Sequence, residues 1–310
     1  MSVKRLFEQF EPENYRIWVE LDRTKDGIFS TTTEIVGVLK KTDSITLHAK
    51  DLEIREIIFN DKRLKFEING DELKIFSPKE SKFEIGKKIS FRIYASGKIT
   101  PAMHGIYPCY YNENGEKKEL FATQFESHHA REVFPCIDEP EAKATFELNI
   151  RTRTDWTVLA NTKIKEETEV GDFKTLTFEK TPKMSTYLLA FVVGDLQNKT
   201  AFTKSGVEVS VWATRAQKSE LLDFPLNFAV RVLEFYEEYF GQKFPLSKCD
   251  HIALPDFSSG AMENWGLITY RETALLAGEK SSISSKKYVA LVIAHELSHQ
   301  WFGNLVTMKW

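Results

Sequence analysis

Residues 286–304 read KKYVALVIAHELSHQWFGN, and this stretch predicts a helix over residues 286–302. Ser284 or Ser285 is expected to cap its first turn, and Gly303-Asn304 is expected to end it. Several apolar side chains should bury one side of the helix in a core, namely Val289, Leu291, Val292 and Ala294.

Two histidines and one glutamate in this helix have the spacing of a metal site. His295 and His299 are one helical turn apart, so both imidazoles leave the same face and can bind one zinc ion. Glu296 can reach a metal-bound water without ligating the metal, as a general base must. The alternative is a helix that carries two histidines by chance. Two unpartnered imidazoles beside a core would cost desolvation free energy, which favours the zinc interpretation.

A second motif, Gly260-Ala261-Met262-Glu263-Asn264, precedes the helix. Taken alone, Glu263 in a loop beside a glycine would be a solvated turn residue. Gly260 and Ala261, however, permit a ligand to approach the backbone closely, and an extended segment at this position could pair its main chain with a peptide. A carboxylate at the end of such a track could bind an α-ammonium group, so that a peptide is held by its free amino end.

The chain before this region is predicted to be rich in β-strands. The run over residues 187–193 is apolar throughout and is followed by Gly194-Asp195, which predicts a strand buried on both sides. Asn69-Gly70 predicts a tight hairpin. Side chains alternate between apolar and polar, as in half-buried strands, over residues 15–22, 89–94 and 146–150. The prediction is a β-rich domain over residues 1–197.

After residue 197 the apolar residues recur at steps of three and four. This period predicts a helix that ends at Gly241. Strand-like segments follow at residues 252–254 and 267–270. The pattern is typical of an α+β domain over residues 198–310.

The composition of the chain limits the kinds of partner that it can bind. A length of 310 residues, about twice that of a usual domain, predicts two folded domains. Hydrophobic residues make up 42% of the chain, which argues against a disordered chain. A net charge of −3 argues against a nucleic-acid partner or an anionic membrane surface, and no stretch approaches the roughly 18 apolar residues of a membrane helix. Residues 1–8 lack the apolar segment of a secretory signal, so we expect a cytoplasmic protein. The three widely spaced cysteines are expected to be reduced thiols.

Taken together, the motifs resemble the gluzincin zinc aminopeptidases of the aminopeptidase N type. The resemblance rests on HELSHQWFGNLVTM at residues 295–308, PDFSSGAMEN at 255–264, TQFE at 123–126 and FPCIDEP at 134–140. It implies a multidomain fold with a saddle-like antiparallel β domain followed by part of a thermolysin-like α+β catalytic domain. It also implies that the enzyme removes single residues from peptides with a free N-terminus, through attack by a metal-activated water.

The resemblance assigns roles residue by residue. His295 and His299 would be ligands of one zinc ion, and Glu296 would be the catalytic general base. Glu263 would be the main partner of the substrate's amino group, within a substrate-binding segment that comprises Gly260, Ala261, Met262, Glu263 and Asn264.

Gln124 and Glu126 would line the pocket for the first side chain of the substrate. Two carboxylates near one site repel each other, and a bound ammonium group compensates both Glu126 and Glu263. His128 and His129 follow this element. Adjacent histidines in a strand or loop point apart, so we expect them to be structural.

In this family the third zinc ligand is a glutamate that would fall at position 318, whereas the sequence ends at Trp310. The family's oxyanion-stabilising tyrosine would also lie further on. We therefore expect an incomplete zinc aminopeptidase that is inactive by itself. The alternative is a catalytically inactive binding or scaffolding paralogue that keeps the amino-end pocket.

Overall fold

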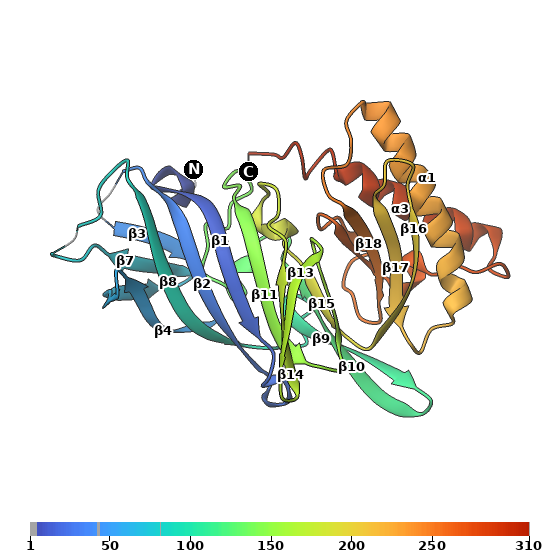
Figure 1. Ribbon diagram of the computed structural model, residues 1–310, viewed down its shortest axis with the longest axis horizontal. Coiled ribbons are helices and arrows are strands. Elements are labelled where there is room, and N and C mark those ends of the chain that lie inside the picture. The colour runs from blue at the N-terminus through green and yellow to red at the C-terminus, as the bar shows by residue number, and fades with distance from the viewer. Residues whose placement is uncertain (1–4, 42–43, 81, 310) are drawn as a thin grey trace.

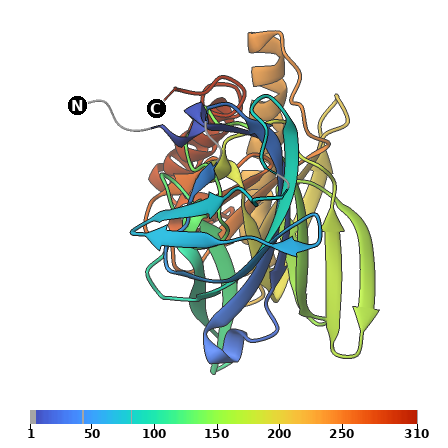
Figure 2. The same cartoon turned by 90° about the vertical axis from the view of Figure 1, so that its left-hand side faces the viewer.

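The computed structural model describes residues 5–41, 44–80 and 82–309. Residues 1–4, on which part of the cytoplasmic prediction rests, and Trp310 lie outside this description. Figure 1 shows long strands in the N-terminal part and, beside them, a sheet with the helices α1 and α3 along one side. In the view of Figure 2 the N-terminal strands lie in front. This arrangement agrees with a β domain followed by part of an α+β domain.

An eight-stranded sheet forms the largest layer of the N-terminal part. In sheet order its strands are β13 (Ile164–Val170), β14 (Phe173–Phe178), β11 (Thr145–Arg153), β1 (Phe10–Glu20), β2 (Ile28–Leu39), β8 (Lys88–Lys98), β4 (Leu52–Phe59) and β5 (Lys62–Arg63). The neighbours pair antiparallel except β1 and β11, which are parallel. Tyr15, Ile17 and Val19 of β1 are buried, which confirms the predicted alternation.

Two smaller sheets complete this part of the chain. One contains β12 (Thr157–Ala160), β15 (Phe191–Gly194), β10 (Glu116–Gln124) and β9 (Gly105–Glu113), and the other contains β3 (Ser44–His48), β7 (Glu72–Phe76) and β6 (Phe66–Asn69). β6 and β7 form the predicted hairpin. The turn itself is Gly70-Asp71, since Asn69 is the last residue of β6, and Gly70 takes the positive φ of +58°.

The prediction of one strand over residues 187–193 is wrong for its first half. Residues Thr186–Leu188 form a 3₁₀ turn, and β15 begins only at Phe191. The physical reason is the buried side chain of Asn161. It donates to the carbonyl of Leu188 at 2.7 Å and accepts from the Ala190 N–H at 2.9 Å, so these backbone groups are satisfied without a strand partner.

A five-stranded sheet with three helices forms the C-terminal part. Its strands, in order, are β16 (Leu196–Phe202), β17 (Glu208–Thr214), β18 (Lys248–Leu254), β20 (Leu267–Arg271) and β19 (Ala261–Met262). The helices are α1 (Asp223–Phe240), α2 (Glu272–Leu275) and α3 (Ile283–His299). α1 ends at Gly241 with φ +62°, as predicted. The division predicted between residues 197 and 198 falls inside β16 and remains a prediction.

The start of α3 differs from the sequence prediction. Ser282, not Ser284 or Ser285, is the N-cap, and its side chain accepts a hydrogen bond from the Ser285 N–H at 3.1 Å. A cap side chain must lie outside the helix and reach the third helical N–H. Ser282 meets this condition because the helix begins at Ile283, three residues earlier than predicted.

Short 3₁₀ turns lie between the main elements, at Leu6–Glu8, Thr24–Asp26, Ala130–Glu132 (η3), Thr186–Leu188 and Ser219–Leu222. The three cysteines are buried and form no disulfide. Among the described residues, no helix combines the length and the apolar character needed to cross a membrane.

One buried side chain joins the two parts of the chain. Besides its contacts near β15, Asn161 donates to the carbonyl of Trp265 at 2.9 Å, next to the Gly260-Asn264 motif. Asn161 is only 2% exposed. Gly266 is in contact with the backbone of Asn161, where a Cβ atom would not fit. The motif is therefore supported from the β domain.

We predict that Asn161→Ala lowers the unfolding free energy by about 3 kcal/mol, because it leaves three buried backbone groups without a partner. Urea denaturation followed by circular dichroism measures the change. The matched control is Asn198→Ala, at an exposed asparagine whose side chain donates to Thr200, and it should shift the midpoint little. Equal shifts in the two variants would contradict the role of Asn161.

Candidate metal and amino-end site

The two histidines of α3 converge on one point. The Nε2 atoms of His295 and His299 lie 3.0 Å apart, and their rings are inclined by 77°. Two nitrogens that share one tetrahedral zinc ion lie roughly 3.3 Å apart. The pair is open to solvent and can supply two ligands to one ion.

The backbone fixes the ring of His299 in the tautomer that a metal requires. Its Nδ1 lies 3.0 Å from the carbonyl oxygen of Phe302. A carbonyl only accepts, so Nδ1 carries the proton, and Nε2 of the neutral ring is left unprotonated toward His295. Metal-ligating histidines commonly use such a hydrogen bond to set the ring orientation. These residues therefore fit a zinc ion.

Glu296 is a buried carboxylate next to this pair. It is 5% exposed, and its Oε2 atom has no hydrogen-bond partner among the described residues. Burial, and then the charges of Glu263 and Glu126, raise the pKa of Glu296 to about 8. An unpaired buried carboxylate is costly unless a cation lies nearby. The surroundings of Glu296 thus favour a positive charge at the site.

The Gly260-Asn264 motif forms the edge of the five-stranded sheet. Ala261 and Met262 make up β19, which pairs antiparallel with β20. The side chains of Met262 and Asn264 are buried, and Asn264 Nδ2 donates to Thr269 at 3.2 Å. These two residues therefore offer a ligand their backbone rather than their side chains. Gly260 is exposed, and its carbonyl accepts from the Arg271 N–H.

Two amides at the end of α3 hold the backbone of Glu263. Gln300 Nε2 and Asn304 Nδ2 both donate to its carbonyl oxygen, at 3.1 and 2.9 Å. Both amide side chains are buried. The Glu263 carboxylate is mostly buried, and its Oε1 lies 3.9 Å from His299 Nδ1. The carboxylate is thus fixed close to the histidine pair. Sequence reasoning did not assign Gln300 and Asn304 this role.

The β domain contributes Gln124 and Glu126. Gln124 ends β10 and is buried, and its Oε1 has no partner among the described residues. Glu126 lies two residues further, in a turn. Partial burial of its carboxylate and the charge of Glu263 raise the pKa of Glu126, whereas His299 lowers it. Glu126, Glu263 and His299 are therefore close enough to act on one another's charge.

Tyr187 is a further residue near these carboxylates. Its side chain is buried, and its OH donates to the carbonyl of Gly303 at 3.3 Å. Burial, together with the charges of Glu263 and Glu126, raises the pKa of Tyr187. The sequence shows Tyr187 only as part of an apolar run, so the pattern contained no signal for its position at the site.

The prediction that His128 and His129 point apart is wrong. Their rings stack at a centroid distance of 4.8 Å, because the two residues lie in a turn, where the alternation of a strand does not apply. His129 Nδ1 lies 3.0 Å from the carboxylate of Glu132. His129 therefore belongs to a separate polar cluster that includes Glu132.

A buried histidine lies on β18. His251 of β18 is fully buried, and its Nδ1 lies 2.9 Å from the OH of Tyr270, whose pKa is raised by burial and by the charge of Glu296. Burial and the charge of Lys248 lower the pKa of His251 to about 3. His251 is thus neutral in the folded chain over most of the pH range.

Comparison with known proteins identifies the family. Residues 11–188 match the Peptidase M1 N-terminal domain, and residues 224–310 match the Peptidase family M1 domain. The whole chain is 51% identical to an aminopeptidase N of Lactococcus lactis subsp. lactis and 44% identical to one of Lactobacillus helveticus. It is 41% identical to a puromycin-sensitive aminopeptidase of Caenorhabditis elegans.

The chain belongs to peptidase family M1. Each of these matches covers 100% of this chain but only 36%, 36% and 34% of the respective relative. The chain therefore spans about a third of the length of the relatives it matches.

We predict that acid destabilises the chain partly through His251. Its folded pKa lies below the ordinary value of 6.5, so between about pH 6.5 and 3 the unfolded chain binds a proton that the folded chain does not. Stability contributed by the neutral histidine is present above pH 6.5 and is lost as the pH falls. His251→Gln should remove a loss on the order of 4 kcal/mol from this pH range. Urea midpoints at pH 7 and pH 4 test this, and an equal drop in both proteins would contradict it.

Proposed function

We propose that the chain carries the zinc-binding and amino-end-binding parts of a metallo-aminopeptidase that removes single residues from the free amino end of peptides. The observation that supports this most is the buried, unpaired carboxylate of Glu296 beside two convergent imidazoles. The names of the relatives, aminopeptidase N and puromycin-sensitive aminopeptidase, support the same activity.

Glu296 would hold and move the proton of the reaction. His295 and His299 would hold a zinc ion, which would supply an activated water and a polarising charge for the scissile carbonyl. Without a cation nearby, the raised pKa keeps Glu296 protonated at neutral pH, whereas a positive charge at the histidine pair lowers the pKa and leaves an ionised base. Its unpartnered Oε2 can then accept a proton from the attacking water and return it to the leaving amine.

Glu263 and Glu126 would bind the amino end of the substrate. Burial, and then the charge of Glu263, raise the pKa of Glu126. The repulsion between the two carboxylates would be relieved by an α-ammonium group between them. The edge strand β19 leads up to Glu263 and can pair its main chain with an extended peptide. A peptide aligned in this way presents the bond after its first residue to the histidine pair.

We further infer that the third zinc ligand is the glutamate expected at position 318, outside residues 1–310. Two imidazoles leave zinc short of the three protein ligands that catalytic sites use, so these residues alone should hydrolyse peptides negligibly. A non-catalytic scaffold remains the second candidate function. The two are distinguished by a longer form of the protein that contains position 318, because a scaffold would bind peptides there without turnover.

In such a longer form, Glu263→Ala should lower kcat/KM for peptides with a free amine. The loss should correspond to an increase of about 2–4 kcal/mol in the activation free energy, the cost of losing one partner of a desolvated charge pair. Acetylation of the peptide removes the ammonium charge and should lower kcat/KM to a similar extent. Initial-rate assays on matched free and acetylated peptides measure both effects.

The matched control is Glu279→Gln, an exposed glutamate away from the site, which should leave kcat/KM unchanged. Acetylation should also matter little once Glu263 has been replaced. If free and acetylated peptides are cleaved equally well by the unmodified protein, the site is that of an endopeptidase and the amino-end assignment is wrong.

A further inference from the structure

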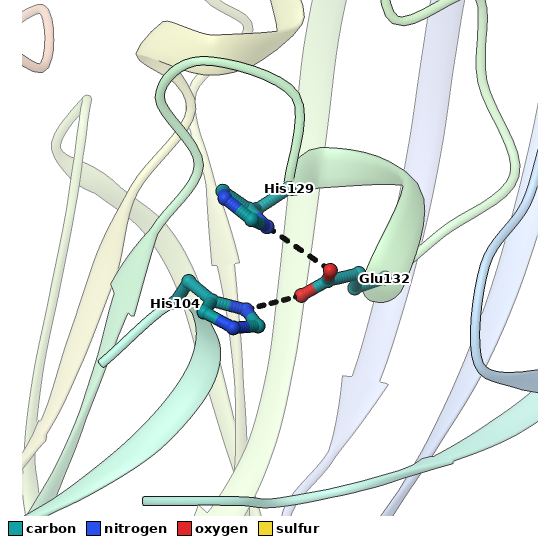
Figure 3. Close-up of side chains that lie close together, drawn as sticks. All are labelled: His104, His129 and Glu132. Atoms are coloured by element: carbon teal, nitrogen blue, oxygen red, sulfur yellow. Dashed lines mark hydrogen bonds and ion pairs between the residues drawn. The ribbon is translucent and has the colours of Figure 1, made fainter. Parts of the chain in front are cut away.

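His104, His129 and Glu132 form a compact polar cluster in the β domain (Figure 3). His104 Nδ1 lies 2.6 Å from Glu132 Oε2, and His129 Nδ1 lies 3.0 Å from Oε1 of the same carboxylate. The two rings stack with their centroids 4.2 Å apart. Both imidazoles therefore direct a nitrogen at one carboxylate from the same side.

The three residues come from separate segments that the fold brings together. His104 precedes β9, His129 lies in the turn after β10, and Glu132 ends η3. Their candidate ligand atoms all lie within 4.8 Å of one another. Two imidazole nitrogens and one carboxylate oxygen are a donor set that suits zinc.

We propose that His104, His129 and Glu132 bind a second divalent metal ion, of the zinc class, at a site separate from the histidine pair of α3. In this site the ion would bind the two Nδ1 atoms, and each neutral ring would carry its proton on Nε2 instead. The donors need no long movement, because each nitrogen already lies at hydrogen-bonding distance from an oxygen of Glu132.

The Glu132 carboxylate is in the charge state that binds a cation. The Glu132 side chain is 9% exposed. Burial tends to raise its pKa, but hydrogen bonds from His129, Lys50 and His104 outweigh this effect and lower it. Glu132 is therefore ionised at neutral pH, the state in which a carboxylate ligates a metal. Gly105 packs closely, since a Cβ atom there would lie 3.2 Å from Glu132 Oε2.

One side of the cluster opens to a cavity of about 420 Å³. His104 and Glu132 line it together with Asp51, Glu53 and Lys98. Two further carboxylates give this cavity an environment favourable to cations, and its volume leaves space for waters to complete the coordination of a metal that has three protein ligands.

Lys50 competes for the same carboxylate. Its Nζ lies 2.9 Å from Glu132 Oε1 and 4.0 Å from Asp51 Oδ2. The Lys50 side chain is 34% exposed, so it can move toward Asp51 when a metal binds. The ammonium group lowers the affinity for a metal by charge repulsion. This competition makes the proposal testable by a gain as well as a loss of binding.

The site would also stiffen the turn that carries Glu126. The His129 N–H donates to the carbonyl of Phe125 at 2.8 Å, so His129 closes the turn that contains Glu126. A metal held by His129 and by His104 ties this turn to the start of β9. This consequence rests on the proposed function, whereas the metal site itself does not.

The test is zinc titration of the His299→Ala chain, in which the site on α3 is disabled. Isothermal titration calorimetry should detect one zinc ion per chain. Adding Glu132→Gln should abolish this binding or weaken it at least tenfold. Adding His128→Ala, at the neighbouring histidine that bonds Ser127 instead, should leave it unchanged. Circular dichroism verifies that each variant is folded.

Adding Lys50→Met instead should tighten zinc binding by about tenfold, because the competing charge is removed. The proposal would be overturned if zinc bound neither to the His299→Ala chain nor to the chain that also carries Lys50→Met. It would also be overturned if Glu132→Gln left zinc binding intact. Peptidase activity is not part of the readout. If zinc binding to the unsubstituted chain is unaffected by His299→Ala but lost in Glu132→Gln, the second site stands and the assignment of the α3 site fails.

Discussion

Gln300 and Asn304 donate to the same carbonyl oxygen of Glu263, and the geometry of the whole site depends on this shared contact. An aminopeptidase must hold the amino end of its substrate at a fixed distance from the reacting bond. Gln300 directly follows His299, the second histidine of the pair on α3. The helix that presents the imidazoles therefore also fixes the segment whose carboxylate would bind the ammonium group, so the two subsites cannot move independently.

The charges of the site are unbalanced without ligands. Burial, and then the charge of Glu263, raise the pKa values of Glu126 and Glu296, and the charge of Glu126 also acts on Glu296. Such an arrangement reduces the stability of the folded chain. In the proposed function two cations would relieve it, a metal ion at the histidine pair and an ammonium group near Glu263. We therefore regard the proposed specificity for free amines and the proposed need for a metal as consequences of the same electrostatic constraint.

The features predicted correctly from the sequence depend on neighbours along the chain. The alternation in β1, the end of α1 at Gly241 and the one-turn spacing of His295 and His299 are of this kind. Features that depend on distant contacts were missed. The run at residues 187–193 is divided because Asn161 binds its backbone, and the cluster around Glu132 forms only when the turn after β10 meets the start of β9. No local pattern carries this information.

Exchange of Glu296 for glutamine in a longer form of the protein that contains position 318 tests the central claim most directly. The account predicts that kcat falls by roughly 10²–10⁴-fold, the contribution of a general base, while the zinc content of the purified protein stays unchanged. Glutamine keeps the size of the side chain but cannot accept the proton. Turnover near that of the unsubstituted protein, with zinc bound, would contradict the account.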